Sequence, residues 1–228
     1  MTAERLSACR QSWYKRVMRV VAALGVIIPA LTLAACGGSG GNRTTTGAAL
    51  TATAVPLRLQ VLAASDLPPG IRLERVRVVS AAGAVLASLD TTLQPASFAS
   101  VLTRAGFTSA AVEMLHKRSD RAVAGYSVAA RVRSPEAAVA AAQSLQDVLG
   151  AACRGKCSTS TLRFDVPSLS GALGVDRAAV SRGRATHTFY VVVPFDATVL
   201  VEAMSASRLV ARAAIAGAAV ALVRRVAR

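Results

Sequence analysis

The sequence predicts a single α+β domain, in which a largely antiparallel sheet is covered by two or three helices. Several short runs alternate apolar and polar residues, as half-buried strands do. Other stretches carry apolar residues at helical spacing between helix start and stop signals. Strands and helices do not alternate regularly, as they would in a βαβ fold, so antiparallel pairing is favoured.

The first half of the domain supplies short strands and one helix. Leu57, Leu59 and Val61 alternate with polar residues and predict a strand, which a turn over 66–70 ends. A second strand is predicted over 71–78, with a phase change that suggests a bulge, and a hairpin partner over 84–89. A helix is predicted over 98–105, where Gly106 would form its C-terminal cap. The segment 107–116 is ambiguous but alternates as a strand around Val112, and a polar turn follows at 117–120.

The second half begins with a strand over 126–132 and a well-marked helix. Ser134-Pro135-Glu136 combines a capping hydroxyl, a first-turn proline and a carboxylate near the positive end of the helix dipole. That helix should run to about Leu149, where Gly150 stops it. Further strands are predicted over 162–166, 186–193 and 199–203.

The chain ends in a predicted helix over 207–225. Its apolar run, 213–223, has eleven residues and is too short to span a bilayer. We therefore expect the helix to pack on the sheet, with a membrane-surface helix as the alternative. The stripe expected to face the core is Leu209, Ala213, Ala216, Val220 and Val223.

The N-terminal segment has the order of parts that an exported, lipid-anchored bacterial protein requires. A basic start is followed by an uncharged apolar stretch over 20–33, which is the pattern of a secretory signal. The next residues, Leu33-Ala34-Ala35-Cys36, closely resemble the lipobox of bacterial lipoproteins. In that family the cysteine thiol takes a diacylglyceryl group, the chain is cut just before it, and the new amine is often acylated, with chains such as palmitate. The resemblance implies a signal peptide over 1–35 and lipidation of Cys36.

The alternative is an uncleaved membrane helix over 17–35. That stretch is near the short limit for spanning, contains Arg19 and is interrupted by Pro29. Two or three acyl chains on Cys36 would anchor the protein without such a helix. Both interpretations place the remaining chain on the extracytoplasmic side of the cell membrane, and an outer-membrane location stays open.

Residues 36–54 form a glycine-, serine- and threonine-rich segment that predicts a flexible tether after the lipidated cysteine. Removal of the signal peptide leaves 228 − 35 = 193 residues, of which 55–228 are enough for one domain with its own core.

The chain is strongly basic, with a formal net charge of +15. The signal peptide carries five basic residues and Glu4, so its removal leaves +11. An anionic envelope surface or acidic envelope polymer would attract such a charge. Nucleic acid is disfavoured as a partner, because the protein is exported and no aromatic residues are interleaved with the basic ones. A solvated basic surface without a specific partner is the alternative.

Cys153 and Cys157 flank three residues in a loop after the second long helix. In an oxidising compartment this spacing favours a local disulfide, which would stabilise a turn by only ~2 kcal/mol. A redox or metal role is the alternative, although nothing nearby supplies the further ligands that zinc needs. We expect no cofactor and no metal.

No catalytic motif is recognisable. His116 and His187 lie on different candidate strands without an accompanying nucleophile or metal-ligand pattern, and we expect both to be structural. Ser127 and Ser170 lack the glycine framing of a nucleophile elbow. Asp165 and Asp176 could converge as an acid and base pair, as any two carboxylates could.

The turn over 66–70, the helix end at 105–107, the strand running into Ser134-Pro135-Glu136 and the closing strands and helix resemble small bacterial lipoproteins with a PsbP-like domain. The resemblance extends from about Val55 to the C-terminus, and it implies the fold but no functional residue, because such folds host ligand-binding, sensory and accessory roles. We therefore expect a binding, accessory or sensory module at the cell envelope, not an enzyme. The alternatives are a lipid or glycolipid carrier with an apolar cavity and an envelope hydrolase.

Overall fold

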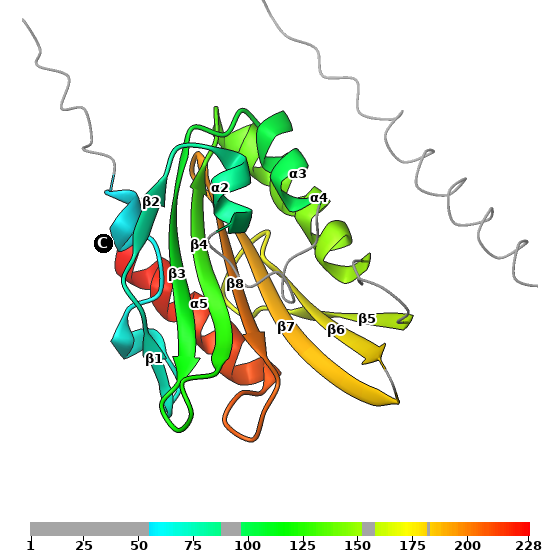
Figure 1. The fold of residues 1–228 in the computed structure, drawn as a ribbon. Coiled ribbons are helices and arrows are strands. Elements are labelled where there is room, and N and C mark those ends of the chain that lie inside the picture. Colours follow the sequence, from blue (N-terminus) through cyan, green and yellow to red (C-terminus); the bar gives the residue numbers. More distant parts are fainter. Residues whose placement is uncertain (1–54, 88–96, 152–157, 182) are drawn as a thin grey trace, which may run out of the picture. The chain divides into compact units, whose positions relative to one another are not determined.

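The computed structural model describes residues 55–87, 97–151, 158–181 and 183–228. These residues form one antiparallel sheet with helices on both faces, which confirms the predicted α+β class (Figure 1). The predicted lipidation site Cys36 and the predicted disulfide partners Cys153 and Cys157 lie outside the described residues. Of the helices among the described residues, none has the length and apolarity that crossing a membrane requires.

The sheet has eight strands in the order β1-β3-β4-β8-β7-β6-β5, with β2 pairing on β3 as well. The strands β3, β4, β8 and β7 lie towards the middle of the sheet, and every neighbouring pair is antiparallel. The bounds are β1 Ile71–Leu73, β2 Arg77–Val79, β3 Ser109–Lys117, β4 Val123–Arg131, β5 Ser158–Asp165, β6 Leu173–Ser181, β7 Arg184–Phe195 and β8 Thr198–Ser205.

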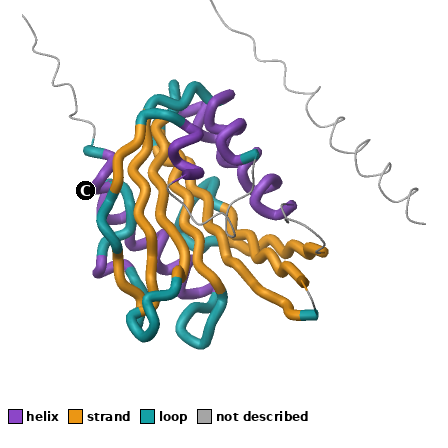
Figure 2. The backbone as a smooth tube through the Cα atoms, viewed as in Figure 1, coloured by secondary structure: helices purple, strands orange, loops and turns teal. Residues whose placement is uncertain are grey.

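Two layers of helices cover the two faces (Figure 2). The helices α2 (Ala82–Ala87), α3 (Phe98–Arg104) and α4 (Pro135–Ala151) pack on one face. The other face is covered by α5 (Arg212–Val226) and by two short 3-10 helices, η2 (Leu57–Leu59) and η3 (Ala64–Asp66). We call these the α4 face and the α5 face.

Alternation along β8 shows how one strand serves both layers. Val199, Val201 and Ala203 are buried in the core under α4, whereas Leu200 and Met204 are buried in the core under α5. Successive side chains of a strand point to opposite faces, so a strand between two helical layers is buried on both sides. The sheet therefore separates two apolar cores.

Most of the predicted elements are present. The strands expected over 126–132, 162–166, 186–193 and 199–203 correspond to β4, β5, β7 and β8, and the ambiguous segment 107–116 is largely strand β3. The helix expected over 98–105 is α3, and Gly106 takes the left-handed backbone (φ +74°) of a C-terminal cap. Helix α4 begins at Pro135 as expected and continues through Gly150 to Ala151.

Two predicted strands are wrong. The chain over 57–61 begins with the 3-10 helix η2, because the buried side chains are Leu57, Val61 and Leu62, while Leu59 is 52% exposed. That spacing fits a turning chain and not an alternating one. The expected hairpin partner over 84–89 is helical in its described part, where α2 buries Val85 against the core under α4. The predicted second strand over 71–78 is two strands, β1 and β2, that pair with different parts of β3.

Strand β6 was not predicted, because charged residues interrupt its apolar pattern. Asp176 and Arg177 are buried on opposite faces of β6 against side chains from other elements, Arg212 of α5 and Tyr190 of β7. The terminal helix begins at Arg212 instead of Ser207, and it packs on the sheet as expected. Its buried face is rotated relative to the predicted stripe: Leu209 and Ala213 are exposed, and the buried residues are Ile215, Ala216, Ala218, Ala219, Leu222 and Val226.

Candidate functional site

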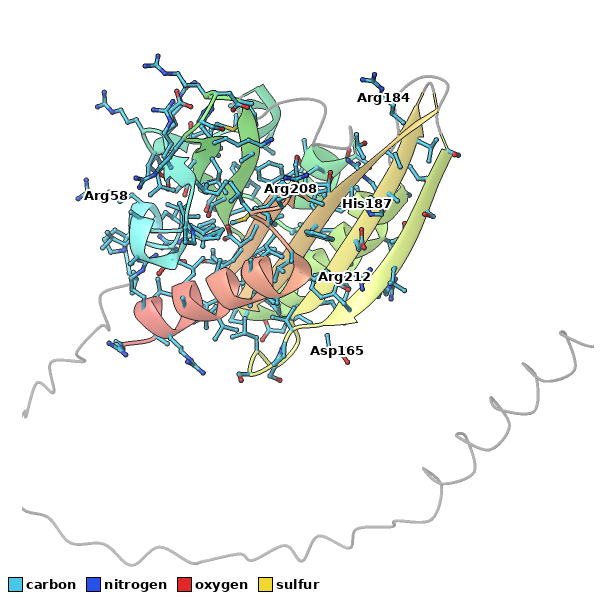
Figure 3. All side chains as sticks on the ribbon, turned by 90° about the horizontal axis from the view of Figure 1, so that it is seen from below. Arg58, Asp165, Arg184, His187, Arg208 and Arg212 are labelled. Atoms are coloured by element: carbon cyan, nitrogen blue, oxygen red, sulfur yellow. The ribbon has the colours of Figure 1, made fainter. Side chains whose placement is uncertain are left out.

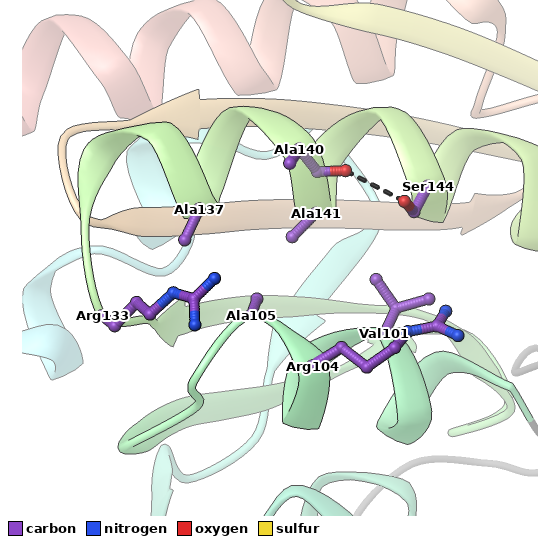
Figure 4. A pocket seen from close by; sticks show the side chains of 8 residues that line it. All are labelled: Val101, Arg104, Ala105, Arg133, Ala137, Ala140, Ala141 and Ser144. Atoms are coloured by element: carbon purple, nitrogen blue, oxygen red, sulfur yellow. Dashed lines mark hydrogen bonds between the residues drawn. The ribbon is translucent and has the colours of Figure 1, made fainter.

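A groove between α3 and α4 is the candidate binding site (Figure 4). It encloses about 120 Å³, and its floor consists of small apolar side chains. The guanidinium groups of Arg104, from the end of α3, and Arg133, from the segment after β4, flank it. The residues that line the groove are Val101, Arg104, Ala105, Arg133, Ala137, Ala140, Ala141 and Ser144.

The backbone around the groove positions Arg133. A Cβ atom built on Gly106 would lie only 2.9 Å from the Cβ of Arg133, so the side chain of Arg133 packs directly over the glycine. The backbone N–H of Arg133 also donates to the carbonyl of Ala105 at 3.3 Å. These two contacts hold Arg133, just after the end of β4, against the C-terminal end of α3.

Helix α4, the other wall, starts at a side-chain cap. The hydroxyl of Ser134 accepts a hydrogen bond from the N–H of Ala137 at 3.2 Å. The Ser134 side chain also lowers the pKa of Glu136 by hydrogen bonding to its carboxylate. The cap fixes the first turn of α4, so it also fixes where Ala137 meets the groove.

Both groove arginines are available to a ligand. Among the described residues, neither Arg104 nor Arg133 forms an ion pair, and no carboxylate lines the groove. A guanidinium presents a planar fork of donors that matches a carboxylate or a phosphate. The arrangement can hold anionic groups over an apolar floor.

A second polar cluster lies on the α5 face, at the start of α5 (Figure 3). Asp176 of β6 is nearly buried and accepts from Nε and Nη2 of Arg212, at 3.1 and 2.6 Å, through its Oδ2 atom. Its Oδ1 atom lies 3.1 Å from Nδ1 of His187 on β7. Arg212 also lies over the ring of Phe164, 5.9 Å from its centroid. The cluster ties α5 to the outer strands of the sheet.

A row of three buried polar side chains crosses the centre of the sheet on the α5 face. Glu113 of β3 is in register with Ser127 of β4, and Ser127 is in register with Glu202 of β8. Their exposed fractions are 3%, 0% and 0%. The Ser127 hydroxyl donates to Oε1 of Glu202 at 3.1 Å, while Oε2 of Glu113 and Oε2 of Glu202 have no hydrogen-bond partner among the described residues. We call Glu113, Ser127 and Glu202 the carboxyl row.

Burial shifts the titration of the carboxyl row. It raises the pKa of Glu113 from 4.5 to about 7, against a smaller lowering by the charge of Arg225. It also raises the pKa of Glu202 well above 4.5, which the Ser127 hydrogen bond opposes and the nearby charges of Glu113 and Asp66 reinforce. Both carboxyl groups therefore favour the protonated form at a pH where an exposed glutamate is ionised.

The structure separates the acidic pair considered from the sequence. Asp176 is in register with Leu162 of β5, so both lie on the α5 face, whereas Asp165 follows Leu162 by three residues and lies on the opposite face. The two carboxylates do not converge. Ser127 is buried in the carboxyl row, and Ser170 is exposed in the loop between β5 and β6.

The two histidines lie on different strands, β3 and β7, as predicted. His116 contacts the carbonyl of Arg121 and the carboxylate of Glu74, at 2.9 and 3.3 Å. His187 is oriented by Asp176, but no hydrogen bond in the described structure joins its ring to a hydroxyl or thiol nucleophile. Nor does any group of three or more His, Cys, Asp or Glu side chains in the described ranges have an arrangement that could hold a metal ion.

Sequence reasoning missed the groove arginines and the carboxyl row. The groove has no sequence signal, because α3 and α4 meet only through the fold. The row did have one: Glu113 and Glu202 each interrupt an otherwise apolar run of strand length. A carboxylate at a core-facing strand position indicates a buried polar site.

Comparison with known proteins identifies no family. No protein-family model matches the sequence, and no curated protein matches it. Among solved structures, the extracellular domain of PknH from Mycobacterium tuberculosis is similar, with a TM-score of 0.48 and 12% sequence identity. The similarity covers 74% of this chain and 95% of that domain.

Proposed function

We propose that the protein is a lipid-anchored extracytoplasmic binding module whose groove between α3 and α4 takes a small molecule with two acidic groups. The observation that carries the ligand class is the pair of arginines, Arg104 and Arg133, which form no ion pair with any described residue and flank an alanine-floored groove. Each guanidinium can bind one carboxylate or phosphate, and the alanines leave room for a short apolar link between them.

The volume of the groove limits the size of the ligand. Drug-sized ligands occupy pockets of about 300–1,000 Å³, whereas this groove encloses about 120 Å³. It therefore suits a short dicarboxylate or a molecule that joins a carboxylate to a phosphate. Binding would depend mainly on charge-assisted hydrogen bonds, with little apolar burial.

Titration with succinate tests the ligand class, with acetate at equal ionic strength as the monoanionic comparison. We expect the full chain, purified in a non-ionic detergent, to bind succinate more tightly than acetate. Arg104→Ala or Arg133→Ala should each weaken succinate binding about tenfold or more, because a hydrogen bond to a charged group contributes about 1.5–3 kcal/mol.

Arg184→Ala is the matched control, since Arg184 lies at the tip of the β6–β7 hairpin and its loss changes the net charge equally (Figure 3). Equal affinity in wild type, Arg104→Ala and Arg133→Ala would overturn the groove as the site. An equal loss in Arg184→Ala would show that only net charge matters.

The anchor is proposed from Leu33-Ala34-Ala35-Cys36 and the tether that follows. Labelling of cells with a palmitate analogue should mark the wild-type protein and leave Cys36→Ser unlabelled. Labelling of Cys36→Ser equal to wild type would reject lipidation at this residue. The lipid-carrier and hydrolase hypotheses stay alternatives, and a stoichiometric lipid adduct in native mass spectrometry would favour the carrier.

A further inference from the structure

The carboxyl row lies beneath the segment through which the domain joins its predicted tether. Residues 57–66, which we call the covering segment, contain η2 and η3 and bury Leu57, Val61 and Leu62 against the α5-face core. The backbone N–H of Leu62 donates to the Ser127 hydroxyl at 3.0 Å. The same hydroxyl donates to Glu202, so one side chain connects the covering segment to a buried carboxyl group.

Arg225 of α5 holds the covering segment from the other side. Its guanidinium donates to the carbonyls of Leu59 and Val61, both at 2.7 Å, and to Oδ2 of Asp66 at 2.9 Å. Asp66 in turn accepts from the N–H of Ala63 at 2.8 Å. The segment is therefore attached by polar contacts to Ser127 of the row and to Arg225, whose charge acts on both row glutamates.

The charges in this region do not balance when all the acids are ionised. Glu113 of β3, Glu202 of β8 and Asp66 of η3 are three carboxyl groups, and Arg225 of α5 is the one cation that acts on both row glutamates among the described residues. The side chain that β4 contributes to the row is the neutral Ser127, and Val191 of β7, in register with Glu202, is apolar. Arg225 is already engaged by Asp66 and two carbonyls.

A buried carboxylate needs partners for both oxygens, and one oxygen of Glu113 and one of Glu202 have none within the described part of the chain. Such a group must either stay protonated or gain access to water. Water can reach the row if the covering segment lifts, because that segment lies over Ser127.

We propose that the carboxyl row is a proton-operated latch: in the protonated state it holds the covering segment on the sheet, and loss of the protons releases residues 57–66. The protein would thereby sense the proton concentration outside the cytoplasm and change how the domain is attached to its tether. The latch lies on the opposite face of the sheet from the arginine groove, so it does not depend on ligand binding there, whereas the compartment in which it senses protons rests on the proposed extracytoplasmic location.

The direction of the effect follows from the two states of Glu113. The latched state binds its proton with a pKa of about 7, whereas a released, hydrated glutamate titrates near 4.5. The equilibrium therefore favours the latched state most strongly below pH 4.5. Between pH 4.5 and about pH 7, the equilibrium constant for release increases tenfold per pH unit for one proton. The difference of about 2.5 between these two pKa values predicts that the equilibrium constant for release increases about 300-fold from Glu113 alone. Glu202 acts in the same direction.

Hydrogen exchange of the full chain in a non-ionic detergent, measured from pH 4.5 to 8 and corrected for intrinsic exchange, tests the latch. We expect the protection of residues 57–66 to fall as pH rises, while the amides of α4 keep theirs. In the double variant Glu113→Gln/Glu202→Gln, which imitates the protonated row, protection of the covering segment should persist at pH 8, and each single variant should lose part of the pH dependence. Glu136→Gln, at an exposed position on α4, is the matched control and should behave as wild type.

Protection of residues 57–66 that does not change with pH in the wild type would overturn the proposal. So would a pH dependence in both glutamine variants that equals that of the wild type. Unchanged protection of α4 verifies that each variant is folded. If a variant fails this check, the carboxyl carbons of Glu113 and Glu202 can be titrated by NMR in the wild type, where pKa values near 4.5 would reject the latch.

Discussion

Single glycines decide where the backbone of this domain can approach itself. In β4, a Cβ atom on Gly125 would lie 1.8 Å from the carbonyl oxygen of Ala203 on β8. At the end of α3, Gly106 provides the left-handed cap on which Arg133 packs. In α5, by contrast, a Cβ atom on Gly217 would have no neighbour within 4 Å. The same residue type is therefore required at one position and replaceable at another.

Gly125→Ala and Gly217→Ala should change stability in opposite directions. The first must displace the backbone of β8, and we expect a loss of at least about 3 kcal/mol in the free energy of unfolding. The second replaces an exposed helical glycine with the best helix former and should add about 0.5–1 kcal/mol. Urea denaturation of the two variants measures both effects, and a stabilised Gly125→Ala would contradict the close approach of β4 and β8.

At the scale of elements, α4 joins the groove to the core. Its inner side buries Ala138, Leu145 and Leu149 against the sheet, and its edge supplies Ala137 and Ala141 to the groove. The placement of this edge depends on where the helix begins, which the Ser134 cap determines. A local sequence signal thus positions a tertiary site.

Removal of the cap should destabilise the domain measurably. We expect Ser134→Ala to lower the free energy of unfolding by about 1 kcal/mol, because the N–H of Ala137 loses its acceptor. Ser144→Ala is the matched comparison, since the Ser144 hydroxyl donates to the carbonyl of Ala140 inside the same helix. It should change stability by less than about 0.5 kcal/mol, because alanine suits a helix interior better. Equal effects of the two substitutions in urea denaturation would argue against the cap.

At the scale of the whole described domain, one sheet separates two apolar cores, and each face carries its own polar site. The α4 face carries the arginine groove, and the α5 face carries the carboxyl row and the Asp176 cluster. Both cores share the central strands β4, β7 and β8, whose alternate side chains enter one core or the other. Damage to either core therefore weakens the strands on which the other depends.

Leu145 of α4 and Leu222 of α5 are completely buried on opposite sides of the sheet. Each Leu→Ala substitution should cost about 2–5 kcal/mol. The two residues share no core cluster, so the double variant should lose the sum to within about 0.5 kcal/mol. We expect one cooperative transition in every variant. The midpoint measured by circular dichroism should coincide with the midpoints measured by hydrogen exchange in α4 and in α5. Two separated transitions would show that the layers unfold independently.

The sequence by itself determined the features that rest on local chemistry. The Ser134-Pro135 start of α4 and the Gly106 cap were readable because a cap needs only neighbouring residues. The strands β4, β5, β7 and β8 were readable because apolar residues recur at every second position in their sequences. The α+β class followed from the order of these elements. The anchor at Cys36 remains a prediction from the same kind of local signal.

Only the tertiary structure decided the rest. Strand β6 contains Asp176 and Arg177, which are buried only because Arg212, His187 and Tyr190 arrive from other elements. The buried face of α5 was also decided by the shape of the sheet beneath it, since its alanine-rich sequence fits more than one rotation. The arginine groove and the carboxyl row join residues from separate elements, so their chemistry depends on contacts between segments far apart in the chain, which no local pattern specifies.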